Sequence, residues 1–203
     1  MIRTQNVGIV IPTQGRITLE RCLESLMARN QGGYGAEVIV VADTFQMEEE
    51  TKQHIRTLTN KYYAAYVEHN AGHSDWGYPQ LNYVYRHVPL LSDYVCNIGD
   101  DDVFEAGVLP QIIEILSKKP LSLFMFQVAL FPSPNRGNQR PVILWNDESR
   151  DIERKKVTGQ NLFVPKIPTF MGNWTDDFVF MKETIALWHN QVTWVPLVTC
   201  RCY

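Results

Sequence analysis

Apolar residues in the first half of the chain form short continuous runs, separated by segments with helical spacing. Residues 7–11 and 37–42 are such runs, and each predicts a strand that is buried on both faces. Residues 62–68 and 93–98 predict two further strands. Apolar residues that recur at intervals of three and four predict helices from residue 18 and over 109–116. The charged segment 47–59 and the second part of the segment 69–88 are also expected to be helical. This alternation predicts an α/β fold, with a mostly parallel central sheet flanked by helices.

The second half of the chain is less regular. Residues 121–131 predict a strand, and residues 142–145 predict its short hairpin partner. An acidic loop and a helix are expected over residues 173–188, followed by a last strand from residue 193. Because no internal repeat, low-complexity tract or linker interrupts the sequence, we expect one domain over residues 1–203.

The composition is that of an ordinary globular protein. Of the 203 residues, 45% are hydrophobic and 20% are charged, which excludes disordered and fibrous classes. Lys and Arg number 19 and Asp and Glu number 22, giving a formal charge of −3 and a pI of about 5.9. This balance argues against general attraction to nucleic acid or to an anionic membrane. No apolar run reaches the roughly 18 residues that span a bilayer, so we expect a soluble protein.

The four cysteines show no CxxC spacing. We interpret Cys22, Cys96, Cys200 and Cys202 as reduced thiols of a cytoplasmic protein rather than as a disulfide framework. Cys200 and Cys202 are expected to point to opposite faces of the last strand. The location would be the host cytoplasm if the protein is encoded by a phage.

Three consecutive aspartates, Asp100, Asp101 and Asp102, follow the strand predicted at 93–98. Carboxylates packed this closely repel one another, so a partly desolvated sheet edge requires a counter-charge. Carboxylate oxygens prefer hard cations such as Mg²⁺, Mn²⁺ or Ca²⁺, and a strand-end pair can hold such a cation against a diphosphate. A solvated acidic turn that caps the next helix would explain the same residues.

Two other predicted strands end in polar residues at the same sheet edge. Asp43 ends the second strand, where its carboxylate could accept hydrogen bonds from a base or a ribose, or form an ordinary Asx turn. Pro12, Thr13 and Arg16 follow the first strand, where the arginine could meet a phosphate or be a surface residue. Since the chain has neither GxGxxG nor GxxxxGK[ST], neither a Rossmann dinucleotide site nor a P-loop is predicted.

Two further segments carry candidate chemistry. The segment 69–82 combines aromatic and amide side chains that suit a sugar or a base, although Gln80 and Asn82 could also be helix-surface residues. Asp176 and Asp177 form a second acidic pair, and a carboxylate there could take a proton from an attacking hydroxyl. The same pair could instead cap the helix that follows.

The order of these motifs resembles the inverting GT-A glycosyltransferases of family 2. The resemblance rests on VGIVIPTQGR, TLERCLESL, EVIVVAD, HNAGHSDWGYPQLNY and NIGDDDVFEAGVL, which cover residues 6–116 in order. It implies the GT-A fold of nucleotide-diphospho-sugar transferases. Residues 1–116 would bind the nucleotide-diphosphate sugar, and residues 117–203 would supply the acceptor side and the catalytic base. It also implies a divalent metal, Mn²⁺ or Mg²⁺.

The resemblance gives the nucleotide-binding residues their roles. Pro12 and Thr13 would line the nucleotide pocket, and Asp43 would read the base. Asn82 matches the second residue of the family's Arg-Asn pair, while Leu81 replaces the arginine.

The resemblance also gives the acidic residues their roles. Asp102 and Asp100 would be metal ligands, and Asp101 would contact the ribose or the metal. Asp177 would be the catalytic base, with Asp176 as the alternative.

The predicted function is therefore a metal-dependent, inverting glycosyltransferase that moves a sugar from a nucleotide-diphosphate sugar to an acceptor hydroxyl. A nucleotidyltransferase is one alternative, although the segment PTQGR lacks the glycine-rich loop of that class. A catalytically degenerate nucleotide- or sugar-binding module is another, and Gly99 and Leu81 favour it. The acceptor stays open among saccharides, proteins and modified DNA bases, and a homodimer through the last strand is an untested option.

Overall fold

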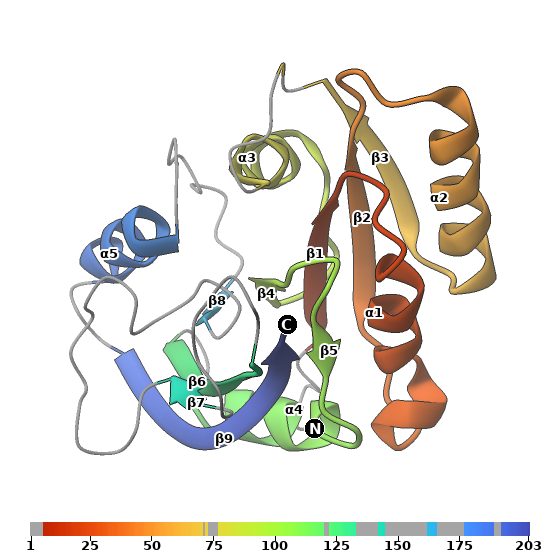
Figure 1. The fold of residues 1–203 in the computed structure, drawn as a ribbon. Coiled ribbons are helices and arrows are strands. Elements are labelled where there is room, and N and C mark those ends of the chain that lie inside the picture. The colour runs from red at the N-terminus through yellow and green to blue at the C-terminus, as the bar shows by residue number, and fades with distance from the viewer. Residues whose placement is uncertain are drawn as a thin grey trace.

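A single mixed sheet runs through the computed structural model, which describes residues 6–70, 72, 77–119, 122–132, 142–144, 162–165, 177–188 and 192–203. Its strand order is β3-β2-β1-β4-β8-β6-β9-β5, and β7 pairs with β6 (Figure 1). The strands are β1 (Val7–Thr13), β2 (Glu37–Asp43), β3 (Ala65–His69), β4 (Tyr94–Asn97), β5 (Val103–Phe104), β6 (Leu123–Leu130), β7 (Val142–Leu144), β8 (Leu162–Pro165) and β9 (Val192–Cys202). The helices are α1 (Leu19–Ser25), the 3₁₀ turn η1 (Ala28–Gln31), α2 (Glu49–Lys61), α3 (Tyr78–His87), α4 (Leu109–Lys118) and α5 (Asp177–Leu187).

The first four strands form the parallel part of the sheet. β1 pairs in parallel with both β2 and β4, and β2 pairs in parallel with β3. The continuous apolar runs of β1 and β2 are buried, as shown by Ile9 and Val40, which have no exposed surface. Parallel pairing brings the carboxyl ends of these strands to one edge of the sheet.

The second half of the sheet mixes directions. β8 is antiparallel to both β4 and β6, while β9 is parallel to β6 and antiparallel to β5. β9 curls under the molecule and returns to the parallel part, where its end lies beside β5 (Figure 1). The α/β fold with flanking helices is thus confirmed, and parallel pairing dominates the N-terminal half only.

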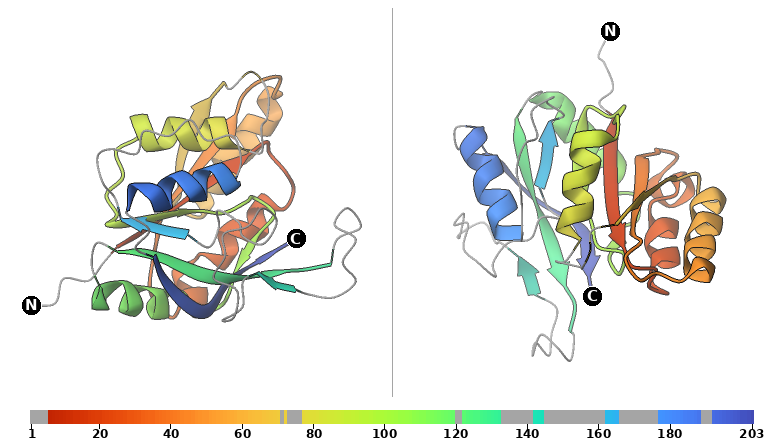
Figure 2. Two further views of the ribbon diagram at one scale, coloured as in Figure 1. Left: turned by 90° about the vertical axis from the view of Figure 1, so that its left-hand side faces the viewer. Right: turned by 90° about the horizontal axis from the view of Figure 1, so that it is seen from above.

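Two apolar cores cover the two faces of the sheet. One core joins strand residues such as Ile9 and Val40 to α1, α2 and α4. The other joins Val10 and Val41 to α3 and α5, which lie on the opposite face (Figure 2). Alternate residues of β1 enter opposite cores, as expected of a strand that is covered on both faces.

Three details differ from the sequence expectations. The strand predicted at 62–68 begins at Ala65, because α2 continues to Lys61 and Tyr63 adopts the left-handed conformation, with φ of 55°. The short strands β5 and β8 were not predicted. Cys200 and Cys202 share one face of β9, with their sulfurs 3.8 Å apart, because residues two apart in a strand point the same way.

No helix in the described ranges is both long enough and apolar enough to cross a membrane.

Candidate active site

Residues from three neighbouring strands converge at the carboxyl edge of the parallel strands. β1 ends at Thr13, β2 ends at Asp43, and β4 is followed within three residues by Asp100. Because β2 and β4 both pair with β1, these ends lie next to one another. The residues Thr13, Asp43 and Asp100 are each 4% exposed, so three polar groups are buried at this edge.

The hydroxyl of Thr13 holds the carboxylate of Asp100. Thr13 Oγ1 donates a hydrogen bond of 2.6 Å to Asp100 Oδ2, and it accepts one of 2.9 Å from the backbone N–H of Gly15. Burial raises the pKa of the Asp100 carboxyl above its ordinary value, while the Thr13 hydroxyl and the Arg16 guanidinium oppose this rise. Asp100 is therefore a desolvated carboxylate that depends on its partners to stay charged.

Arg16 bridges the first two aspartates. Its Nη1 lies 3.3 Å from Asp100 Oδ1 and 3.0 Å from Asp101 Oδ2. The arginine side chain is 52% exposed and that of Asp101 is 33% exposed, so this ion pair lies at the mouth of the site. Two carboxylates share one guanidinium here, which leaves the cluster net negative.

The third aspartate faces its own loop. Asp102 is 2% exposed, and its Oδ2 accepts a 2.9 Å hydrogen bond from the backbone N–H of Gly99. A β-carbon on Gly99 would lie only 2.8 Å from Asp101 Oδ1 and 3.0 Å from Asp102 Oδ2. A side chain at residue 99 would therefore have to displace the Asp101 carboxylate from its present position.

Residues of α1 and of the C-terminal end of the chain contact the loop formed by residues 99–102, which we call the aspartate loop. Arg21 Nη2 donates a 3.0 Å hydrogen bond to the carbonyl oxygen of Asp101, and its guanidinium lies 4.3 Å from the centre of the Tyr203 ring. Arg201 binds both carboxylate oxygens of Glu105, at 2.6 and 2.7 Å. No sequence pattern marked Arg21, because its contact joins residues 80 positions apart.

The thiols near the loop are buried. Cys22 Sγ lies 3.5 Å from the carbonyl oxygen of Gly99, and burial together with Asp102 and Asp100 raises its pKa well above the ordinary value. The pKa of Cys202 is also raised, by its hydrogen bond with Cys200 and by burial. These thiols therefore stay protonated, which argues against a cysteine nucleophile.

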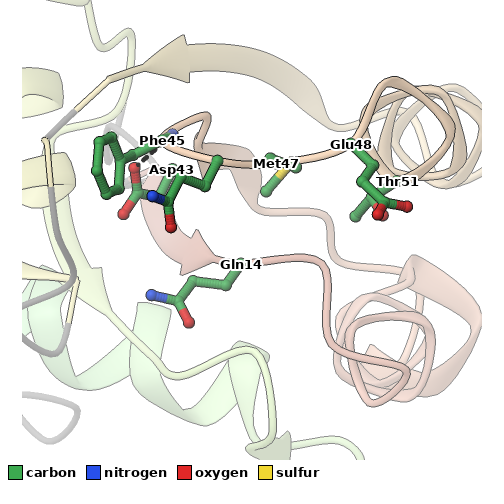
Figure 3. A pocket seen from close by; sticks show the side chains of 7 residues that line it. Gln14, Asp43, Phe45, Met47, Glu48 and Thr51 are labelled. Atoms are coloured by element: carbon green, nitrogen blue, oxygen red, sulfur yellow. Dashed lines mark hydrogen bonds between the residues drawn. The ribbon is translucent and has the colours of Figure 1, made fainter.

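A pocket of about 470 Å³ with polar and apolar walls adjoins Asp43 (Figure 3). Its walls come from the loop after β1, the loop after β2 and the start of α2. The side chains that line it are Gln14, Asp43, Phe45, Gln46, Met47, Glu48 and Thr51. Asp43 Oδ1 accepts a 3.1 Å hydrogen bond from the N–H of Phe45, so the Asx turn considered from the sequence is present. The turn aligns the carboxylate beside the exposed ring of Phe45, which is 41% exposed.

The start of α3 packs against the end of β1. A β-carbon on Gly77 would lie 2.6 Å from the Pro12 side chain, and Gly77 has φ of 83°, so glycine suits this position on both grounds. Leu81 is 2% exposed and belongs to the core beneath α3. Asn82 lies on the same helix and is partly exposed.

The second acidic pair is described only in part. α5 begins at Asp177, so the helix expected after the pair is present. Asp176 lies outside the described residues, as do His73, Asp75 and Trp76 of the segment before α3.

In the described part of the chain, no group of three His, Cys, Asp or Glu side chains is arranged to hold a metal ion. The chain offers instead the two adjacent carboxylates of Asp100 and Asp101. Such a pair is the donor set typical of a cation that completes its coordination with substrate phosphates and water.

The fold is similar to that of solved glycosyltransferase structures. A structure of S. aureus TarS 1-349 matches with a TM-score of 0.68 and 15% identity, and the match covers 97% of this chain and 60% of that one. The complex of the same TarS region with UDP-GlcNAc gives a TM-score of 0.66 at 13% identity, with 97% and 58% coverage. GalNAc-T7 with UDP, GalNAc and Mn²⁺ gives 0.51 at 14% identity, with 63% and 23% coverage. The chain thus spans less than two thirds of the length of these proteins. No curated protein matches the sequence.

The family model for glycosyl transferase family 2 matches residues 8–175, which include the carboxyl edge and the aspartate loop. The GT-A fold expected from the sequence is confirmed by the same comparisons. On this match, the chain belongs to glycosyl transferase family 2.

Proposed function

We propose that this protein transfers a sugar from a nucleotide-diphosphate sugar to an acceptor hydroxyl, with inversion at the anomeric carbon. The observation that carries the proposal is the convergence of Asp43, Asp100 and Asp101 at one edge of the sheet, beside a pocket with polar and apolar walls. The TarS complexes with UDP and with UDP-GlcNAc support it, because TarS has a similar fold.

The pocket beside Asp43 would receive the nucleoside. The carboxylate of Asp43 only accepts hydrogen bonds, so it suits a base that presents N–H donors, such as uracil, thymine or guanine. Pro12 and Thr13 end β1 next to this pocket, where they would line the ribose and the diphosphate. Asn82, on α3, would be a further contact to the diphosphate.

Asp100 and Asp101 would hold a divalent cation. The donor set fits Mn²⁺ or Mg²⁺, because both ligands are hard oxygens and one of the two is a desolvated carboxylate with too few counter-charges. We assign Asp102 a bracing role instead, since its carboxylate is turned toward Gly99 N. The Mn²⁺ in the GalNAc-T7 structure is consistent with this choice of metal.

When bound, the cation would neutralise charge that develops on the departing diphosphate. The residues of this chain would perform the other steps. Asp43 would orient the nucleoside, Arg16 would add positive charge at the diphosphate, and Asp177 would accept the proton of the attacking hydroxyl, with Asp176 as the alternative base. Attack from the face opposite the leaving group inverts the anomeric carbon without a covalent enzyme intermediate.

We propose the cytoplasm as the location, because the four cysteines are free thiols in this structure and nucleotide-sugar transfer needs no oxidising compartment. The acceptor is a saccharide, a protein or a modified DNA base.

Thermal unfolding with UDP, GDP, TDP, CDP and ADP, each with and without Mn²⁺, tests the donor site. A ligand that binds only the folded state raises the melting temperature by mass action. We expect a metal-dependent rise with one diphosphate, and we expect Asp101→Asn to abolish it. Glu114→Gln is the matched control, since that carboxylate is an exposed surface group of α4. The absence of a shift with every diphosphate would contradict the proposal.

A catalytically degenerate binding module is the second candidate, because position 81 on α3, where the family has an arginine, holds the buried and uncharged Leu81. A metal-dependent shift without any release of nucleoside diphosphate from the nucleotide sugar would favour that candidate.

A further inference from the structure

We infer that Arg16 competes with the divalent cation for Asp100 and Asp101, and that the displaced guanidinium then binds the diphosphate of the donor. The inference rests on the proposed function and assigns one residue two successive partners at the same site. It makes Arg16 a residue that weakens metal binding and strengthens nucleotide binding.

The first step is the position of the guanidinium. One nitrogen, Nη1 of Arg16, lies 3.3 Å from an oxygen of Asp100 and 3.0 Å from an oxygen of Asp101. This is the place between two carboxylates that a bridging cation would take. Metal–oxygen distances of about 2.0–2.1 Å for Mg²⁺ would draw the same two oxygens onto the ion. The guanidinium and the metal therefore cannot both hold these oxygens, and their like charges repel.

The second step is the freedom of Arg16 to leave. Its side chain is 52% exposed, and it belongs to the short loop between β1 and α1, beside Gly15. When Arg16 moves away, Asp100 keeps the hydrogen bond from Thr13, so the buried carboxylate still has a hydrogen-bond donor. Arg21 differs in this respect, because a backbone carbonyl and the ring of Tyr203 both hold its guanidinium.

The third step is the destination of the guanidinium. A donor diphosphate that shares the cation with Asp100 and Asp101 would bring its oxygens to the mouth of the site, where Arg16 is exposed. Arginine binds phosphate oxygens through two parallel N–H donors, which makes it a strong partner for this group. The exchange leaves the carboxylates paired with the metal and the diphosphate paired with both cations.

The test compares Arg16→Gln with Arg29→Gln. Arg29 is an exposed arginine that pairs with Glu24, so the control makes the same change of charge away from the aspartates. Mn²⁺ binding is measured by electron paramagnetic resonance without nucleotide, and UDP binding is measured by calorimetry at saturating Mn²⁺. Circular dichroism and thermal unfolding confirm that each variant is folded. Arg16→Lys, which keeps a charge but loses the planar fork, is the second variant.

For Arg16→Gln we expect about tenfold tighter Mn²⁺ binding and about tenfold weaker UDP binding, because an ion-pair competitor and a phosphate ligand are both removed. Arg29→Gln should match the natural protein in both measurements, and Arg16→Lys should fall between. Unchanged or weaker Mn²⁺ binding by Arg16→Gln would overturn the competition. Unchanged UDP binding would overturn the second role of the guanidinium.

These outcomes differ from a failure of the proposed function. If the natural protein binds UDP with Mn²⁺ and Arg16→Gln changes neither affinity, the function stands and the inference is wrong. If the natural protein binds neither UDP nor the other diphosphates at any Mn²⁺ concentration, the proposed function is wrong and the inference fails with it.

Discussion

Replacing Thr13 with valine tests the link between the end of β1 and the aspartate loop. The hydroxyl of Thr13 donates to Asp100 Oδ2 at 2.6 Å and accepts from the N–H of Gly15 at 2.9 Å. Valine has the same shape but no hydroxyl, so Thr13→Val removes both hydrogen bonds and leaves the packing of β1 almost unchanged.

The cost follows from burial. A hydrogen bond to a charged group contributes about 1.5–3 kcal/mol, and the Asp100 side chain is only 5% exposed, so water replaces the hydroxyl poorly. The N–H of Gly15 is part-buried and adds a smaller cost. The total of about 2–3 kcal/mol corresponds to a melting temperature about 4–12 °C lower for a chain of this size.

Thermal unfolding of Thr13→Val and Thr13→Ser provides the comparison. Serine keeps the hydroxyl, so Thr13→Ser should lose much less stability and should retain metal-dependent nucleotide binding. Thr13→Val should bind the nucleoside diphosphate with Mn²⁺ at least tenfold more weakly, because Asp100 is no longer held in place. Equal melting temperatures and equal affinities for the two variants would refute the role of this hydroxyl.

Three other changes have defined outcomes. Gln31→Leu should lower the free energy of unfolding by about 3–6 kcal/mol in denaturant titrations, because Gln31 is fully buried and makes three hydrogen bonds to backbone groups. The control Gln111→Leu, on the surface, should lower it by less than about 0.5 kcal/mol. Gly99→Ala should weaken nucleotide binding in calorimetry, because the new β-carbon would press on the Asp101 carboxylate; unchanged affinity would contradict the close packing. Burial lowers the pKa of His69, so in acid the folded chain binds fewer protons at this residue than the unfolded chain does. The free energy of unfolding should therefore fall as the pH drops from 7 to 5, and His69→Gln should reduce that pH dependence.

The parallel half of the fold could be predicted because its signals are local. The runs at 7–11 and 37–42 are continuous and apolar, which is typical of strands covered on both faces, and the segment 93–98 carries a shorter apolar stretch. Since parallel strands end at a common edge, the same runs also predict that Asp43 and the aspartate run lie together. By contrast, β5 has only two residues, too few to show a period.

The orientation of the aspartates could not be predicted. Consecutive residues in a loop have no fixed side-chain direction, so no sequence pattern separates Asp102 from Asp101. The two residues differ in the structure because the backbone N–H of Gly99 donates a hydrogen bond to the carboxylate of Asp102. Likewise, the support from Arg21 depends on the fold that brings α1 to the loop, and nothing in the local sequence shows it.

The most direct test of the proposed function follows a nucleotide sugar by proton nuclear magnetic resonance in the presence of the protein and Mn²⁺. We predict metal-dependent release of nucleoside diphosphate, with the sugar first appearing in the anomeric configuration opposite to that of the donor, and we predict no release by Asp101→Asn. A sugar that first appears with the donor's configuration would contradict inversion. Glycosyl transfer would be contradicted if nucleotide sugars with each compatible base bind together with Mn²⁺ but stay intact in the presence of saccharide, protein and DNA acceptors.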